Sequence, residues 1–129
     1  MENRKSIVSG AISDHRNLNV WVVAVDLATQ VYNLTTELPV EEKYGLCSQM
    51  RRAAVSIASN IAEGAARGSR KDFIRYLYFS SGSASELNTQ LIILKNISII
   101  SEDERLIEIH EKLNSVIQMI HGLIRALRK

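Results

Sequence analysis

Apolar residues recur in this chain at alternating intervals of three and four positions, which places them along one face of a helix. The spacing runs from Val20 to Leu38, from Met50 to Ile61, from Phe73 to Leu94 and from Leu106 to Leu127. In the third segment the positions are Phe73, Leu77, Ser80, Ala84, Leu87, Leu91 and Leu94. Such stripes are buried only against other helices. The sequence therefore predicts an all-α, antiparallel up-down-up-down four-helix bundle.

Turn-forming residues set the expected ends of the first two helices. The single proline, Pro39, ends the first helix because the residue before a proline disfavours the helical conformation. The second helix is expected over about 47–65. Gly64 and Gly68 mark its end, since both can adopt a left-handed cap conformation.

Capping residues open the last two helices. Ser69 is a suitable N-cap for a third helix over about 70–97, and Ser101 followed by Glu104 forms a capping box before the fourth. The small residues of Ser80–Ser85 are expected to let a neighbouring helix approach closely.

Length and composition fit one folded domain. The chain has 129 residues, of which 46% are hydrophobic and 23% charged. Residues 1–16 are predicted to be a mobile tail and 17–129 a single domain. The lone Cys47 excludes an internal disulfide and fits a reducing compartment. No apolar run approaches the roughly 20 residues that span a bilayer, so a cytoplasmic location without membrane contact is expected.

The sequence contains no recognisable catalytic or metal-binding set. His15, His110 and His121 are dispersed, and no Glu-x-x-His pair of the di-iron bundle type occurs. The serines lack a paired activating base in the sequence. No enzymatic activity, cofactor or metal is expected.

The predicted topology concentrates basic residues at one end of the bundle. That end collects ten basic residues against four acidic ones, although the whole chain has a net charge of only +2. The candidate nucleic-acid-binding residues are Arg67, Arg70, Lys71, Arg75, Arg125, Arg128 and Lys129. Clustered cations bind phosphate in a salt-dependent manner. The alternative is a solvated basic end without a specific ligand.

Two helices carry a second apolar line beside the first. The candidate oligomer-interface residues are Trp21, Val25, Ala28 and Tyr32 in the first helix, and Ile107, Ile117 and Ile124 in the fourth. One core needs one stripe per helix, so the extra lines indicate a self-association surface. A wide buried face is the alternative.

Polar residues beside the apolar stripes need partners if they are buried. Asn60, Glu63 and Glu86 are interpreted as structural polar residues that form a buried hydrogen-bond network and fix the helix register.

Several motifs occur together in an order typical of one family. They are Val20-Trp21, Leu38-Pro39-x-Glu-Glu42, Tyr44-Gly-Leu46, Gln49-x-Arg-Arg-Ala-Ala-x-Ser56, Ser59-Asn-Ile-Ala-Glu-Gly64 and Gly82-Ser-Ala-Ser-Glu-Leu87. In these motifs the chain resembles the four-helix-bundle family of ribosomal protein S23, or 23S rRNA intervening-sequence proteins. The resemblance covers about 17–128.

The resemblance implies a cytoplasmic bundle similar to the accessory variability determinant of diversity-generating retroelements. That relative forms a ring-like homopentamer, binds nucleic acid and partners a reverse transcriptase. Two hypotheses follow for this chain. The first is a self-associating bundle that binds ribosomal or other structured RNA through its basic end. The second is a protein-interaction scaffold, such as a reverse-transcriptase accessory subunit.

Overall fold

Four long helices make up nearly all of the described chain. The computed structural model describes residues 15, 18–38, 45–97 and 104–129. The helices are α2 (Asn19–Thr36), α4 (Leu46–Ala66), α5 (Arg70–Ile97) and α6 (Glu104–Arg128). The described residues contain no strand. The predicted all-α four-helix bundle is confirmed, and the expected ranges of the second and third helices agree with α4 and α5 to within one residue.

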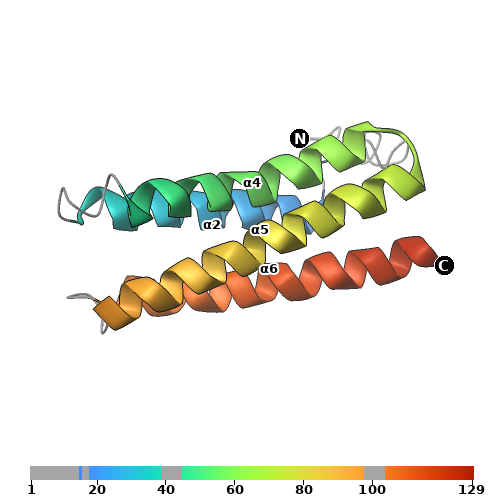
Figure 1. Cartoon of the computed structure of the whole chain (residues 1–129). Helices are drawn as coiled ribbons and strands as arrows, with labels where there is room; N and C mark the ends of the chain where they lie inside the picture. Colours follow the sequence, from blue (N-terminus) through green and yellow to red (C-terminus); the bar gives the residue numbers. More distant parts are fainter. Residues whose placement is uncertain (1–14, 16–17, 39–44, 98–103) are drawn as a thin grey trace, which may run out of the picture.

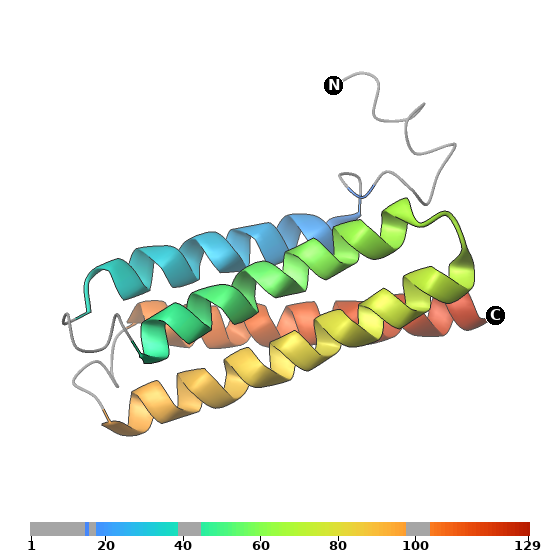
Figure 2. The same ribbon diagram turned by 45° about the horizontal axis from the view of Figure 1, so that its top comes forward.

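Consecutive helices run in opposite directions along the bundle (Figures 1 and 2). α2 packs against α4 and α6, and α5 packs against the same two helices. The turn between α4 and α5 therefore lies at the same end as the start of α2 and the end of α6. This is the up-down-up-down arrangement that the sequence predicts.

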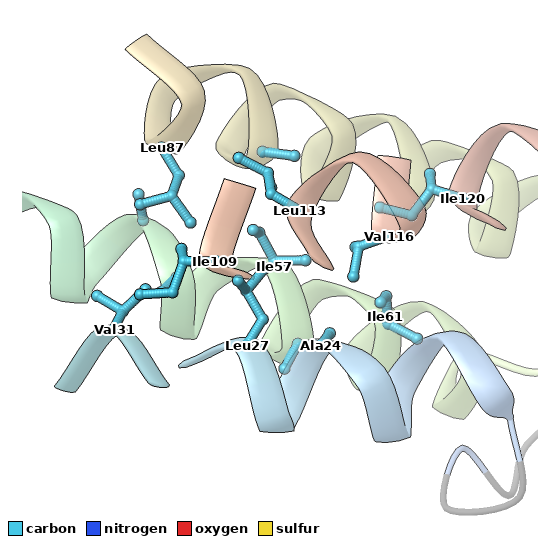
Figure 3. Packing of buried hydrophobic residues seen from close by; sticks show 14 of the residues in the cluster. Ala24, Leu27, Val31, Ile57, Ile61, Leu87, Ile109, Leu113, Val116 and Ile120 are labelled. Carbon is cyan, nitrogen blue, oxygen red and sulfur yellow. The ribbon is translucent and has the colours of Figure 1, made fainter. Parts of the chain in front are cut away.

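The core forms where the predicted stripes meet. All seven positions from Phe73 to Leu94 in the α5 stripe are buried. Figure 3 shows Leu27, Ile57 and Leu113, from three different helices, pointing into the shared core. Their side chains are fully buried. Burying an aliphatic side chain of this kind contributes about 1.5–3 kcal/mol, so the helices are stable only as a packed set.

α4 and α5 form the closest helix pair of the bundle. Gly64 lies within α4 and is buried there, so the prediction that it ends the helix is wrong. A Cβ atom at Gly64 would stand 2.6 Å from the Cβ of Tyr76 and 3.1 Å from a ring carbon of Phe73. Further along, the Ser80 hydroxyl donates to the carbonyl of Ile57 at 2.8 Å. A residue without a side chain is needed at position 64 because the two backbones approach closely there.

The small residues of α5 contribute unequally to this contact. Ser80 and Ala84 are buried against the core, as expected. Gly82 is exposed, and a Cβ built on it would meet nothing within 4 Å. The Ser83 and Ser56 hydroxyls bond across the helix pair at 2.8 Å.

The predicted buried network of Asn60, Glu63 and Glu86 does not form. Asn60 donates to the carbonyl and hydroxyl oxygens of Ser56 within its own helix. Glu63 is exposed and pairs with Arg67, while the exposed Glu86 accepts from Gln90. The carboxylates lie on outer faces, where water satisfies them, so they need no partner inside the bundle.

Ile124 belongs to the core, which contradicts its prediction as an interface residue. It is 2% exposed, whereas Leu123, which a strict seven-residue repeat from Ile109 would bury, is half-buried. A straight α-helix drifts by about 20° per heptad relative to a strict seven-residue repeat. Over the length of α6 this drift moves the buried face from position 123 to position 124.

Gly64 and Gly82 offer a matched pair of substitutions. Ala is favoured over Gly in a helix by about 1 kcal/mol, and overpacking a tight contact costs about 1–3 kcal/mol. We expect Gly82→Ala to raise the free energy of unfolding and Gly64→Ala to lower it. Urea denaturation of both variants measures the difference. A stabilised Gly64→Ala variant would show that α5 can move away freely.

The assignment of Ile124 to the core can be tested against an exposed isoleucine in the same helix. Ile124→Ala should lower the free energy of unfolding by about 2–4 kcal/mol, because it leaves a cavity. Ile107 is 52% exposed. Ile107→Ala should therefore change stability by less than about 0.5 kcal/mol at protein concentrations that keep the chain monomeric. Thermal and chemical denaturation of the two variants gives the comparison, and equal losses would contradict the assignment.

Candidate nucleic-acid interface

The turn between α4 and α5 is built by local backbone chemistry. Gly68 has φ of 84°, the left-handed conformation that glycine adopts without strain. The Ser69 hydroxyl then accepts from the backbone N–H of Asp72 at 3.1 Å and caps the start of α5, as predicted. This fixed turn places Arg70 and Lys71, both exposed, in the first helical turn of α5.

The seven predicted basic residues gather at one end of the bundle. Arg67, Arg70, Lys71 and Arg75 come from the α4–α5 turn and the start of α5, and Arg125, Arg128 and Lys129 from the end of α6. The α4–α5 turn and the C-terminus lie at the same end in both views (Figures 1 and 2). All seven residues are exposed. We call this set the basic end.

Few carboxylates balance these charges. Among the described residues at this end, only Glu63 and Asp72 are acidic. Glu63 pairs with Arg67 at 3.0 Å. Within the described ranges, the other six basic residues form no salt bridge. The basic end therefore keeps a clear positive excess. The basic residues expected there from the first 16 positions lie outside the described residues.

Arg67 differs from the other members of the basic end because it is held in place. Its guanidinium donates to Glu63 and also to the hydroxyl of Tyr76 at 2.7 Å. The phenol of Tyr76, followed by the Glu63 carboxylate, raises the pKa of Arg67 above its ordinary value. Through these two hydrogen bonds Arg67 links α4 to α5 across the turn.

Aromatic rings lie among the arginines on α5. The Tyr76 ring lies 5.0 Å from the Arg67 guanidinium and contacts the Phe79 ring edge-to-face, with centroids 5.2 Å apart. Arg75 lies 5.4 Å from the centroid of Phe79. Phe79 was not predicted to be a surface residue. The signal was available, because position 79 falls outside the three-four spacing of the α5 stripe.

The apolar line on α2 forms one wall of an open groove. Trp21, Val25, Ala28 and Tyr32 all line it, as does His15, whose ring contacts that of Trp21 at 4.9 Å. The groove encloses about 500 Å³. Its other wall consists of Val55, Ala58, Ser59 and Ala62 of α4. The four predicted residues of α2 are thus brought together, along a mostly apolar surface.

The predicted interface residues of α6 lie elsewhere. Ile107 is exposed and borders a smaller depression with Lys95 and His110, between α5 and α6. Burial, followed by the Lys95 ammonium, lowers the pKa of His110. Ile117 is half-buried against the core. Since α5 and α6 form the side of the bundle away from the α2–α4 groove, the two predicted stripes face different directions.

Three further exposed isoleucines occur on α5. They are Ile92, Ile93 and Ile97. They lie toward the end of α5 farthest from the basic end. They were not among the predicted interface residues.

One contact brings a serine and a histidine together. Ser81 on α5 and Nε2 of His121 on α6 are 3.2 Å apart. No local pattern predicts this pair, because 40 positions separate the two residues. A catalytic serine–histidine pair also needs a third group that orients the histidine. In the described residues, no three His, Cys, Asp or Glu side chains are grouped to hold a metal.

A profile of 23S rRNA-intervening sequence proteins matches residues 16–122. The chain belongs to this family. The predicted resemblance is confirmed. A comparison with curated proteins gave no match.

A solved structure shows the same fold. It is the crystal structure of a protein of unknown function from the S23 ribosomal protein family of Bacteroides thetaiotaomicron. The two chains are 26% identical and align with a TM-score of 0.73, over 82% of this chain and 95% of the other. No helix in the described parts of the chain is long and apolar enough to cross a membrane.

Proposed function

We propose that this family member is a non-enzymatic, self-associating bundle that binds RNA through its basic end. The observation that carries the proposal is the gathering of seven basic side chains against two carboxylates at one end of a nearly neutral chain. Lys and Arg clusters release counterions from phosphates, which drives RNA binding. The family's association with 23S rRNA genes favours ribosomal or other structured RNA as the ligand, and a cytoplasmic location.

The positions of Arg70 and Lys71 support a binding role. They occupy the first turn of α5, where the helix dipole is positive and cations are unfavourable. Stability therefore does not explain them. The same dipole adds to their attraction for phosphate. Arg125 and Arg128 lie in the last turn of α6, where cations are favourable, so stability alone could account for these two.

Self-association is proposed through the apolar surfaces. The α2–α4 groove and the depression beside the exposed Ile107 on the α5–α6 side face different directions. A contact between two different surfaces joins copies head to tail and forms a ring if the rotation closes. The family resemblance favours a homopentamer. Five aligned copies would present five basic ends on one rim.

The second candidate function is a protein-interaction scaffold, such as a reverse-transcriptase accessory subunit. The observation that favours it is the apolar α2–α4 groove, which could receive an amphipathic segment of another protein. In that case Trp21 would matter more for function than the basic end.

The RNA proposal is tested with two double variants of equal charge change. Arg70→Ala/Lys71→Ala removes two charges from the basic end, and Arg52→Ala/Lys95→Ala removes two from the opposite end. We expect only the first to weaken binding of a structured ribosomal RNA fragment, because only it removes phosphate contacts. It should also reduce the slope of log affinity against log salt by about 1 per removed cation. Filter binding across a salt titration measures both effects. Equal behaviour of the two variants would exclude the basic end.

Self-association is tested with neighbouring residues of α2. Trp21 lines the groove, whereas Val22 is 51% exposed and lies outside it. Trp21→Ala should lower the oligomer mass measured by light scattering, and Val22→Ala should not. Thermal denaturation checks that the monomeric variant is folded. An unchanged mass for a folded Trp21→Ala variant would show that the groove is not the interface.

A further inference from the structure

The surface beside the basic end contains an arginine–aromatic cluster, defined by Arg67, Tyr76, Arg75 and Phe79. These four residues form one continuous set of contacts. Arg67 stacks on Tyr76, Tyr76 contacts Phe79, and Arg75 lies 5.8 Å from the centroid of Tyr76 and 5.4 Å from that of Phe79. The cluster therefore combines two rings and two guanidinium groups on the outer side of the α4–α5 pair.

The core does not require an aromatic residue at position 79. Leu77 and Ser80 are the buried residues at this level of α5, whereas Phe79 is 45% exposed. The part of its ring that faces solvent adds no packing within the bundle. Its position is better explained by a ligand with flat faces and negative charge.

The cluster is partly fixed before any ligand arrives. The hydrogen bond from Arg67 to the Tyr76 hydroxyl, together with the Glu63 pair, holds Arg67 and Tyr76 together. Gly64 lets α5 approach so closely that the Cβ of Tyr76 packs directly on α4. Tyr76 in turn supports the Phe79 ring. Arg75 has no carboxylate partner among the described residues, so its guanidinium can leave the ring and bind a phosphate.

We propose that this cluster binds unpaired nucleotides of RNA, with a base stacked on Phe79 and Arg75 on the adjoining phosphate. The inference rests on the proposed RNA-binding function and specifies which part of an RNA the protein recognises. Bases inside a duplex are stacked on one another, whereas bases in loops and single strands are available to aromatic side chains. Stacking on aromatic rings tolerates any sequence. The basic end would then supply affinity, and the cluster a preference for unpaired RNA.

A protein partner would also use aromatic and arginine residues. The charge of the surroundings favours RNA, because the cluster adjoins the basic end and, among its described neighbours, only Glu63 and Asp72 are acidic. The experiment separates the two ligands.

The test compares the full-length protein with Phe79→Leu, which keeps an apolar side chain but removes the ring. Ile93→Leu, at another exposed apolar position of α5, is the matched control. Fluorescence anisotropy measures binding of a 20-nucleotide oligouridylate and of a 20-base-pair RNA duplex. Loss of stacking should weaken oligouridylate binding by about five-fold or more in Phe79→Leu. Duplex affinity and the salt slope should stay within error, and Ile93→Leu should match the unmodified protein.

A spectroscopic readout reports stacking directly. A 2-aminopurine placed in the oligouridylate should lose fluorescence on binding to the unmodified protein, and this quenching should disappear with Phe79→Leu. Quenching that persists, or equal losses for both RNAs, would overturn the cluster's role while leaving RNA binding intact. A changed oligomer mass for Phe79→Leu in light scattering would overturn it in favour of a protein contact. If neither RNA binds the unmodified protein, the proposed function itself is wrong.

Discussion

The close contact between α4 and α5 is the constraint on which the rest of the structure depends. Gly64 permits it and the Ser80 hydroxyl bonds across it to Ile57. The two helices meet tightly, and the turn between them is short. Its conformation is fixed by the left-handed Gly68 and by Ser69, which caps the start of α5. That turn sets where the first residues of α5 lie. The position of the basic end, and of the aromatic rings beside it, follows from a packing contact that contains no charge.

The chain is nearly neutral as a whole, but in the folded bundle its positive charges are in excess at one end. Residues that are far apart in sequence, at the start of α5 and the end of α6, reach the same end because consecutive helices reverse direction. Among the described residues, Glu63 reduces their mutual repulsion through its ion pair with Arg67. At the opposite end, Arg105 pairs with Glu37 at 2.9 Å. Both ion pairs are exposed and contribute little stability. The apolar core must therefore offset the repulsion between the like charges of the basic end.

The errors of the sequence predictions have identifiable causes. Asn60 and Glu63 stand beside an apolar stripe, and the spacing alone could not tell an outward from an inward direction. Ile124 was predicted on the wrong face because an α-helix drifts slowly relative to a seven-residue repeat. In each case the apolar pattern itself was predicted correctly. The error lay in the direction in which a side chain points from the helix axis.

The sequence by itself determined the four helices, their buried stripes and the family, because hydrophobic spacing and capping are local properties. It also predicted which basic residues gather at one end, since an up-down-up-down order brings the start of α5 and the end of α6 together. The tertiary structure alone decided the α2–α4 groove, the Ser81–His121 contact and the arginine–aromatic cluster. These features depend on the rotation and separation of packed helices. The groove, the Ser81–His121 contact and the Arg67–Tyr76 link of the cluster join different helices, so no local pattern encodes them.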